Sequence, residues 1–218
     1  MMMNVVSAWH MSGDNIIVEQ MPIIGGYCGG VEETAICDIA TTIASFAIFN
    51  ADMHLNGPIH VRWGTTTNRQ SLQVASHTAA ALDTNTDLLL ANQYYAMAGP
   101  CTEMCLLETA AQAMCDTASG RELLSGVATS KGVITNKVSP MESRMMGEAS
   151  MATCGMDVSE VNEIVERILA KYEPMYSRPP AGKTFQECYD IENIEPTQEY
   201  LDIYDNALNT LSGCGIDF

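Results

Sequence analysis

The chain has 218 residues, of which 47% are hydrophobic and 17% charged, so a sizeable core is possible and disorder is not indicated. Ten basic against twenty-seven acidic residues give a formal net charge of −17, which disfavours binding to nucleic acid or to an anionic membrane. This charge suits a cationic ligand or a partner with a basic face, or it serves solubility alone. No apolar run is long enough to span a membrane and no basic leader is visible, so we expect a soluble, cytoplasmic protein.

The first 24 residues hold two apolar stretches. Met1–Trp9 is predicted to be a buried strand, and His10–Asn15 a loop. The second stretch, Ile16–Ile24, is interrupted only by Glu19 and Gln20, which point either into a site or to solvent. Because a domain rarely begins with its core strand, this opening predicts that the chain is part of something longer.

Strand-like runs then alternate with helical periodicity. The predicted helices are 31–49, 68–82, 102–117 and 140–153, with 50–57 as a return loop and 58–64, 87–94 and 121–128 as the following strands. Four strand–helix units joined by right-handed crossovers predict a parallel sheet, which amounts to half of an eight-fold barrel with two unpaired edges.

The predicted strand at 58–64 alternates in character. It would place Ile59, Val61 and Trp63 on one face and His60 and Arg62 on the other. Two polar residues that point inward are more often layer residues than catalytic groups, so we treat His60 and Arg62 as weaker site candidates.

The last 62 residues read as a helical tail. Capping boxes at Asp157–Glu160 and Thr184–Glu187 start two helices, and Pro196 precedes a final helix that Gly213 ends. We therefore expect four βα units of a half-barrel over residues 1–156 and a C-terminal helical extension, packed on the barrel, over residues 157–218.

The stretch from Ala91 to Glu108 joins the end of an apolar strand to the start of a helix. Gln93 and Tyr95 lie where the strand ends, Gly99–Pro100 forms a turn, and Thr102 is a candidate N-cap. Parallel α/β proteins place their chemistry at such strand ends. Gln93 and Tyr95 are therefore candidate site residues.

The cysteines and histidines do not form a metal-binding pattern. The eight cysteines contain no CxxC pair, and no histidine has a ligand spacing with Cys101 and Cys105. We expect free thiols in a reducing cytosol and no metal, which argues against an unrelated metal-dependent enzyme.

Several segments together resemble one family, the monomethylamine methyltransferases of methylotrophic methanogens. The matching segments are Glu19–Ile23, Gly25–Thr34, Gly57–Gly64, Asn92–Tyr95, Gly99–Glu108, Asp116–Glu122 and Ala181–Asp190. The resemblance runs over the whole chain without an obvious gap. It implies a barrel enzyme that forms a trimer-based homo-oligomer and moves the methyl group of monomethylamine to the Co(I) centre of a separate corrinoid protein.

The same resemblance implies that the catalytic residue is a pyrrolysine, encoded by an in-frame amber codon. This chain contains no pyrrolysine, so the resemblance implies a C-terminal half that starts downstream of that codon. No cofactor is expected in the chain itself, because the corrinoid is carried by the partner protein. The alternative is a catalytically inactive half-barrel remnant that lacks the pyrrolysine-bearing N-terminal half.

Three residues of this sequence resemble those that line the family's substrate pocket: Glu19, Gln93 and Tyr95. A carboxylate at Glu19 suits pairing with a methylammonium ion or accepting its proton. The Gln93 amide and the Tyr95 phenol suit hydrogen bonds that orient the amine. We expect these three residues to meet at the mouth of the barrel.

Overall fold

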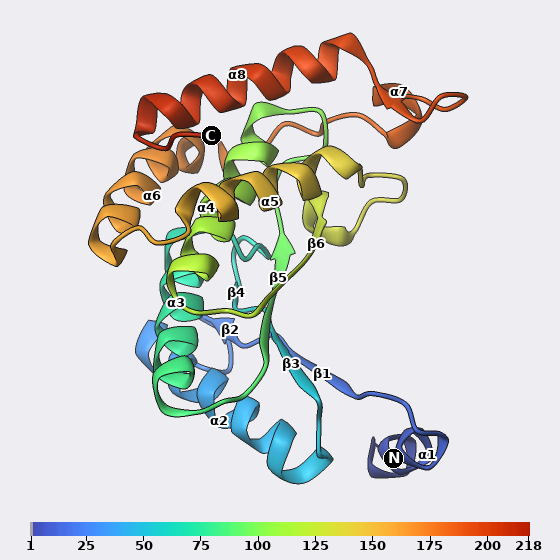
Figure 1. Ribbon diagram of the computed structural model, residues 1–218, viewed down its shortest axis with the longest axis vertical. Helices are drawn as coiled ribbons and strands as arrows, with labels where there is room; N and C mark the ends of the chain where they lie inside the picture. Colours follow the sequence, from blue (N-terminus) through green and yellow to red (C-terminus); the bar gives the residue numbers. More distant parts are fainter. Residues whose placement is uncertain (1) are drawn as a thin grey trace.

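A four-stranded parallel sheet forms the centre of the computed structural model, which describes residues 2–218 (Figure 1). Its strands lie side by side in chain order: β1 (Ile17–Gln20), β3 (Met53–Asn56), β5 (Leu90–Tyr95) and β6 (Leu123–Ala128). The helices that follow them are α2 (Val31–Phe49), α3 (Arg69–Asn85), α4 (Glu103–Ala118) and α5 (Pro140–Thr153). Strands that follow one another in this way, each with its own helix, are typical of a barrel, so the predicted half-barrel is confirmed.

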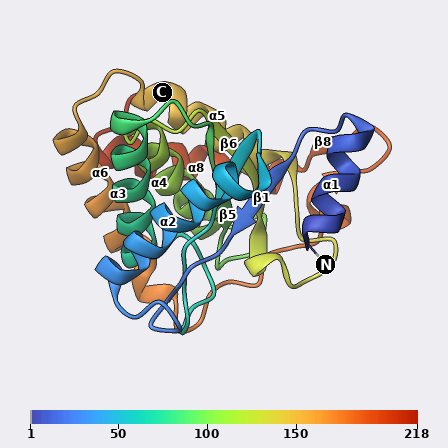
Figure 2. The same cartoon turned by 90° about the horizontal axis from the view of Figure 1, so that it is seen from below.

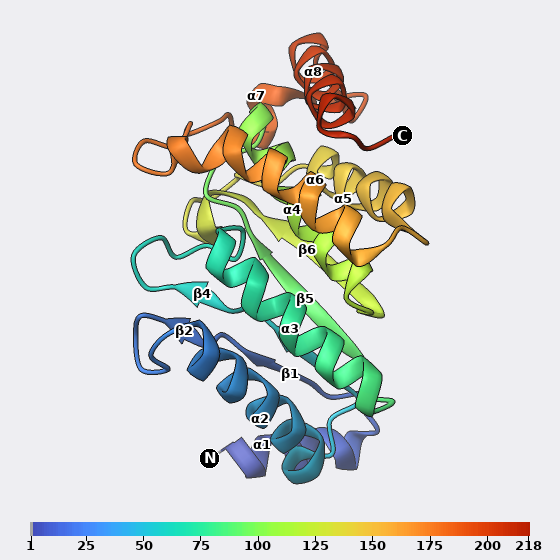
Figure 3. The ribbon, with the colours of Figure 1, turned by 90° about the vertical axis from the view of Figure 1, so that its left-hand side faces the viewer.

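The helices α2, α3 and α4 cover one face of the sheet (Figure 3). Residues whose side chains point away from them form what we call the open face: Ile17, Glu19, Met53, Leu55, Ala91, Gln93, Tyr95 and Leu123. Ile17 is 56% exposed and Leu123 is 44% exposed, which is unusual for apolar residues in the strands of a parallel sheet. Residues 2–218 therefore leave the open face partly uncovered, with exposed apolar side chains at its two edges.

A second, two-stranded parallel sheet continues the first one. Its strands are β2 (Ile23–Ile24) and β4 (Ile59–His60), which pair Ile23 with Ile59. The strand predicted over 58–64 was wrong in its extent, because only two of its residues are in a strand. The main-sheet strand β3 instead lies inside 50–57, which we had predicted to be a loop.

Strand β3 escaped prediction because two of its four residues are polar and yet fully buried. His54 Nδ1 lies 2.9 Å from the hydroxyl of Ser45, and Asn56 donates a 2.7 Å hydrogen bond to Asp38, both on α2. A strand that packs on a helix through hydrogen bonds lacks the apolar alternation by which strands are recognised.

The predicted N-terminal strand was also wrong. Met1 lies outside the described residues, and Met2–Ser12 form helix α1, which ends at Gly13 with φ +77°. Only Val6 of α1 is buried, against Ile16 and Ala51. Figure 2 shows α1 standing apart from the helix layer. A short apolar run does not by itself distinguish a strand from a helix, and here the run forms a helix with a single buried residue.

The C-terminal residues form α6 (Val158–Tyr172), α7 (Phe185–Cys188) and α8 (Gln198–Cys214), with a small antiparallel pair β7 (Tyr189–Asp190) and β8 (Glu195–Pro196). Ile168 of α6 and Leu211 of α8 share one buried core with Leu106 of α4. The final helix ends at Gly215 in the left-handed conformation rather than at Gly213. The boundary at residues 156 and 157 stays a prediction.

Candidate functional site

The three principal candidates lie on the open face. Glu19 of β1 is paired with Leu55, and Leu55 with Ala91, so Glu19 points to the same side as Ala91. Side chains alternate along a strand, so Gln93 and Tyr95 of β5 point to that side as well. All three residues are near the carboxyl ends of their strands, where barrel enzymes place their sites.

The Tyr95 phenol responds to both of its neighbours. Burial raises the pKa of Tyr95 above its ordinary value, the Glu19 carboxylate raises that pKa further, and the nearby Gln93 side chain lowers it. Residues from two strands, more than 70 positions apart in sequence, therefore act on one hydroxyl group.

Gln93 holds an acceptor that has no donor among residues 2–218. Its Oε1 atom is buried and accepts no hydrogen bond. Gly57 lies against this side chain, since a Cβ atom at Gly57 would be 3.3 Å from Gln93 Cβ and 3.4 Å from Oε1. A buried carbonyl oxygen without a donor is costly, so a ligand N–H group would be a favourable partner there.

The weaker candidates are placed differently. The alternation predicted for 58–64 was wrong after His60, because the chain turns at residues 61–63. His60 Nδ1 accepts the Arg62 backbone N–H at 3.1 Å, and the exposed Arg62 guanidinium lies 4.3 Å from the Trp63 ring centre. Within residues 2–218 neither residue hydrogen-bonds to the three principal candidates, and their role in the pocket stays a prediction.

Glu108 of α4 was missed in the sequence because it resembles an ordinary helix carboxylate. It is fully buried and accepts the N–H groups of Met97 and Ala98, each at 2.9 Å, and the Thr67 hydroxyl at 2.5 Å. Burial raises the pKa of Glu108 to about 7, although these hydrogen bonds lower it. Glu108 thus fixes the loop that follows Tyr95.

A buried ionic network occupies the opposite, helix-covered side of the sheet. Arg121 and Asp116 pair at 3.0 Å with no side-chain exposure, and Arg121 also donates to Asn56 at 2.8 Å. Burial raises the pKa of Asp38 to about 6, while burial and Arg121 lower the pKa of His54 to about 4. This network packs the sheet on its helices and does not reach the open face.

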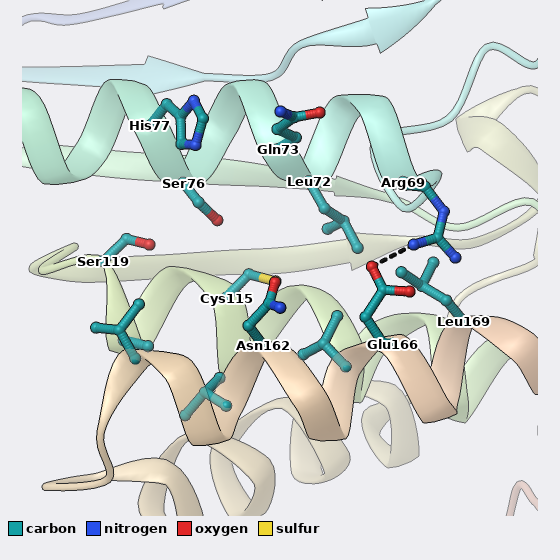
Figure 4. A pocket seen from close by; sticks show the side chains of 14 residues that line it. Arg69, Leu72, Gln73, Ser76, His77, Cys115, Ser119, Asn162, Glu166 and Leu169 are labelled. Atoms are coloured by element: carbon teal, nitrogen blue, oxygen red, sulfur yellow. Dashed lines mark hydrogen bonds and ion pairs between the residues drawn. The ribbon is translucent and has the colours of Figure 1, made fainter.

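A groove of about 370 Å³ lies between α3, α4 and α6 (Figure 4). Apolar side chains such as Leu72 and Leu169 line it, and the Arg69–Glu166 ion pair closes one end. It belongs to the helix layer rather than to the open face, so it is not the candidate site.

Two kinds of site or segment are absent from residues 2–218. No three histidine, cysteine, aspartate or glutamate side chains of this part of the chain are grouped so that they could hold a metal ion. No helix in the same part is both long and apolar enough to cross a bilayer.

Comparisons with known proteins agree with one another. The family model for "Monomethylamine methyltransferase MtmB" matches residues 1–216. MtmB1 of Methanosarcina acetivorans is 52% identical over 98% of this chain, and MtmB3 of Methanosarcina barkeri is 53% identical over 99%. The crystal structure of the Methanosarcina barkeri enzyme superimposes with a TM-score of 0.97 at 52% identity, and a structure described as a hydroxylamine complex of MtmB does so equally well.

The chain spans about half the length of these relatives, 47% in each case. The match spans nearly all of this chain in sequence and in structure, and residues 1–216 include the open face. The chain therefore belongs to the monomethylamine methyltransferase MtmB family.

Proposed function

We propose that this chain supplies the C-terminal half of a methyltransferase that moves the methyl group of monomethylamine to the Co(I) corrinoid of a separate corrinoid protein. One observation carries the proposal: Glu19, Gln93 and Tyr95 share the open face at the strand ends, and no donor in the described part of the chain bonds to Gln93 Oε1. A family member has been crystallised with hydroxylamine, a small amine-like molecule, which supports a small amine as the ligand class.

The chemistry of each residue suits a small cationic substrate. The Glu19 carboxylate attracts methylammonium and is placed to accept its proton, which frees the nitrogen lone pair. Gln93 Oε1 can accept a hydrogen bond from an N–H group of the amine, and the Tyr95 phenol supplies a second polar contact. Two such contacts would restrict the orientation of the amine and thereby of its C–N bond.

Two groups that the family resemblance implies come from outside this chain. The corrinoid of the partner protein supplies the Co(I) nucleophile that receives the methyl group, and the pyrrolysine supplies the site that holds the amine. Gln93 Oε1 has no donor among residues 2–218, so an amine N–H group that reached this oxygen would satisfy it. The completed protein is proposed to form a trimer-based homo-oligomer, which sedimentation of the assembled protein would measure.

The alternative, an inactive half-barrel, describes the isolated chain. Among residues 2–218 the outer strands β1 and β6 have no further strand beside them, and the open face exposes Ile17 and Leu123. Without the residue that holds the amine, this polypeptide by itself is expected to transfer no methyl groups. Turnover by the isolated chain at a rate near that of full-length relatives would contradict this.

The test is a methyl-transfer assay with a cognate Co(I) corrinoid protein. This chain is assayed alone and after co-expression with the remaining half of a relative, pyrrolysine included. We expect transfer only from the assembled protein, and a loss of about 100-fold or more in E19Q. The matched control E32Q changes an exposed glutamate in the first turn of α2 and should be neutral. An E19Q protein as active as E32Q would overturn the proposed role.

A further inference from the structure

Strand β5 loses its neighbour just before the candidate site. The pairing between β3 and β5 ends at Asn56 and Asn92, and β3 then leaves the sheet at Gly57. The next backbone groups of β5, those of Gln93 and Tyr95, therefore need other partners if they are to stay in place.

Two side chains from other elements supply these partners. Gln112 of α4 donates from Nε2 to the Gln93 carbonyl oxygen at 2.6 Å. Its Oε1 atom accepts the Thr66 hydroxyl, also at 2.6 Å, and the Thr66 hydroxyl in turn accepts the Tyr95 backbone N–H at 2.9 Å. Each hydrogen bond fixes the direction of the next, so the chain of bonds from Tyr95 to Gln93 has one consistent polarity.

The other side of β5 is irregular at the same point. The register with β6 shifts between Asn92 and Tyr94, and the Ser125 hydroxyl bonds the Asn92 carbonyl at 2.6 Å. Both neighbouring strands thus deviate where the site begins. Thr66 is 1% exposed and Gln112 is fully buried, so water does not compete for their hydrogen bonds.

We propose that Thr66 and Gln112 are positioning residues. Their hydrogen bonds hold the carboxyl end of β5 so that the Gln93 and Tyr95 side chains face Glu19. This inference rests on the proposed function, because it assigns these residues to the amine site. They touch no substrate themselves and act through the backbone of the two residues that do.

The first test is hydrogen exchange of the Tyr95 amide, measured by NMR on the 218-residue chain. T66V removes the acceptor of this N–H but keeps the shape of the side chain, and T66S keeps a hydroxyl. We expect the protection of the Tyr95 amide to be lost in T66V and retained in T66S. Equal protection in T66V and in the wild type would overturn the proposed hydrogen bond.

The second test asks whether Tyr95 still senses Glu19. The phenol is titrated by NMR with isotope-labelled tyrosine, and Y95F identifies its signal. In the wild-type background E19Q should lower the Tyr95 pKa, because the Glu19 carboxylate raises it. This effect of E19Q should be lost in T66V and in Q112M, where Met keeps the length of the side chain without its polar atoms.

T109V is the matched control. Thr109 is also buried on α4, but within residues 2–218 its hydroxyl donates only to the Cys105 carbonyl of its own helix, at 2.8 Å. T109V should therefore leave the effect of E19Q intact. An undiminished effect in Q112M, or its loss in T109V, would show that these residues only stabilise the fold.

Q112M keeps the test decisive if T66V does not fold. Neither readout requires amine binding or methyl transfer. A failure of the positioning proposal would therefore leave the proposed function standing, and inactivity of the assembled enzyme would leave these readouts unchanged.

Discussion

Gly99 and Gly182 cross so closely that neither position has room for a side chain. A Cβ atom at Gly99 would lie 1.9 Å from the Ala181 carbonyl oxygen, and one at Gly182 would lie 2.3 Å from the Pro100 carbonyl oxygen. Backbone hydrogen bonds of 3.0 and 2.9 Å hold the two segments together, and Lys137 Nζ bonds two carbonyls of the second segment. The C-terminal extension is thereby tied to the loop that follows β5.

This crossing predicts that G99A and G182A destabilise the protein. Because the contacted atoms are backbone and cannot easily move aside, each extra methyl group should lower the free energy of unfolding by about 2 kcal/mol or more, as is typical of overpacking. Gly182 also has φ +64°, which adds strain for any other residue. Urea unfolding of each variant measures the change.

G147A is the control for that series. Gly147 lies within α5, and a Cβ atom there would meet nothing within 4 Å. Alanine should therefore raise the free energy of unfolding by roughly 0.5–1 kcal/mol through helix propensity. A G99A protein as stable as G147A would contradict the crossing.

The buried pair of Arg121 and Asp116 predicts a large effect of R121M. Removing the guanidinium leaves the Asp116 carboxylate buried without its charge partner, which typically costs about 3–5 kcal/mol. In contrast, R144M removes an exposed partner of Glu148, and its effect should stay below about 1 kcal/mol. Thermal or urea unfolding compares the two, and equal effects would refute the special role of Arg121.

Asp38 predicts a pH dependence of stability. Burial raises its pKa from 3.8 to about 6 in the folded state. Between these two pH values Asp38 is mostly protonated in the folded protein and mostly ionised in the unfolded chain. Its contribution is therefore complete below pH 3.8 and is lost as the pH rises through about 6, by about 3 kcal/mol. D38N cannot titrate, so its stability relative to wild type should rise over this window.

Asp157 gives the opposite sign and serves as the comparison. This exposed N-cap accepts the Ser159 N–H and hydroxyl, which lower its pKa. Its contribution is present above the unfolded pKa and is lost as the pH falls through the folded one. The free energy of unfolding of D157N should therefore approach that of the wild type as the pH falls. If the free energy of unfolding of D38N relative to wild type instead rose toward low pH, the assignment of Asp38 would be wrong.

The open face predicts self-association of the isolated chain. I17K and L123K place charge on exposed apolar positions of the two edge strands and should shift sedimentation toward the monomer. M151K changes a more exposed apolar residue, 79% exposed on α5, and should leave association unchanged. A monomeric wild-type chain, or an equal effect of M151K, would count against this role of the open face.

Local sequence predicted much of the helical structure. The helices at 31–49 and 140–153 have the predicted bounds, and Thr102 and Thr184 cap helices as expected. These features depend on residues within a few positions of one another. The strand β3 was missed because its buried polar residues are satisfied only by α2.

The sequence by itself determined the α/β class, the caps that start several helices, the family and the choice of Glu19, Gln93 and Tyr95. Only the tertiary structure decided that these three share one face and that Thr66 and Gln112 hold the end of β5. The physical reason is distance along the chain. Caps and periodicity act over a few residues, whereas these contacts join residues that only strand pairing and helix packing bring together.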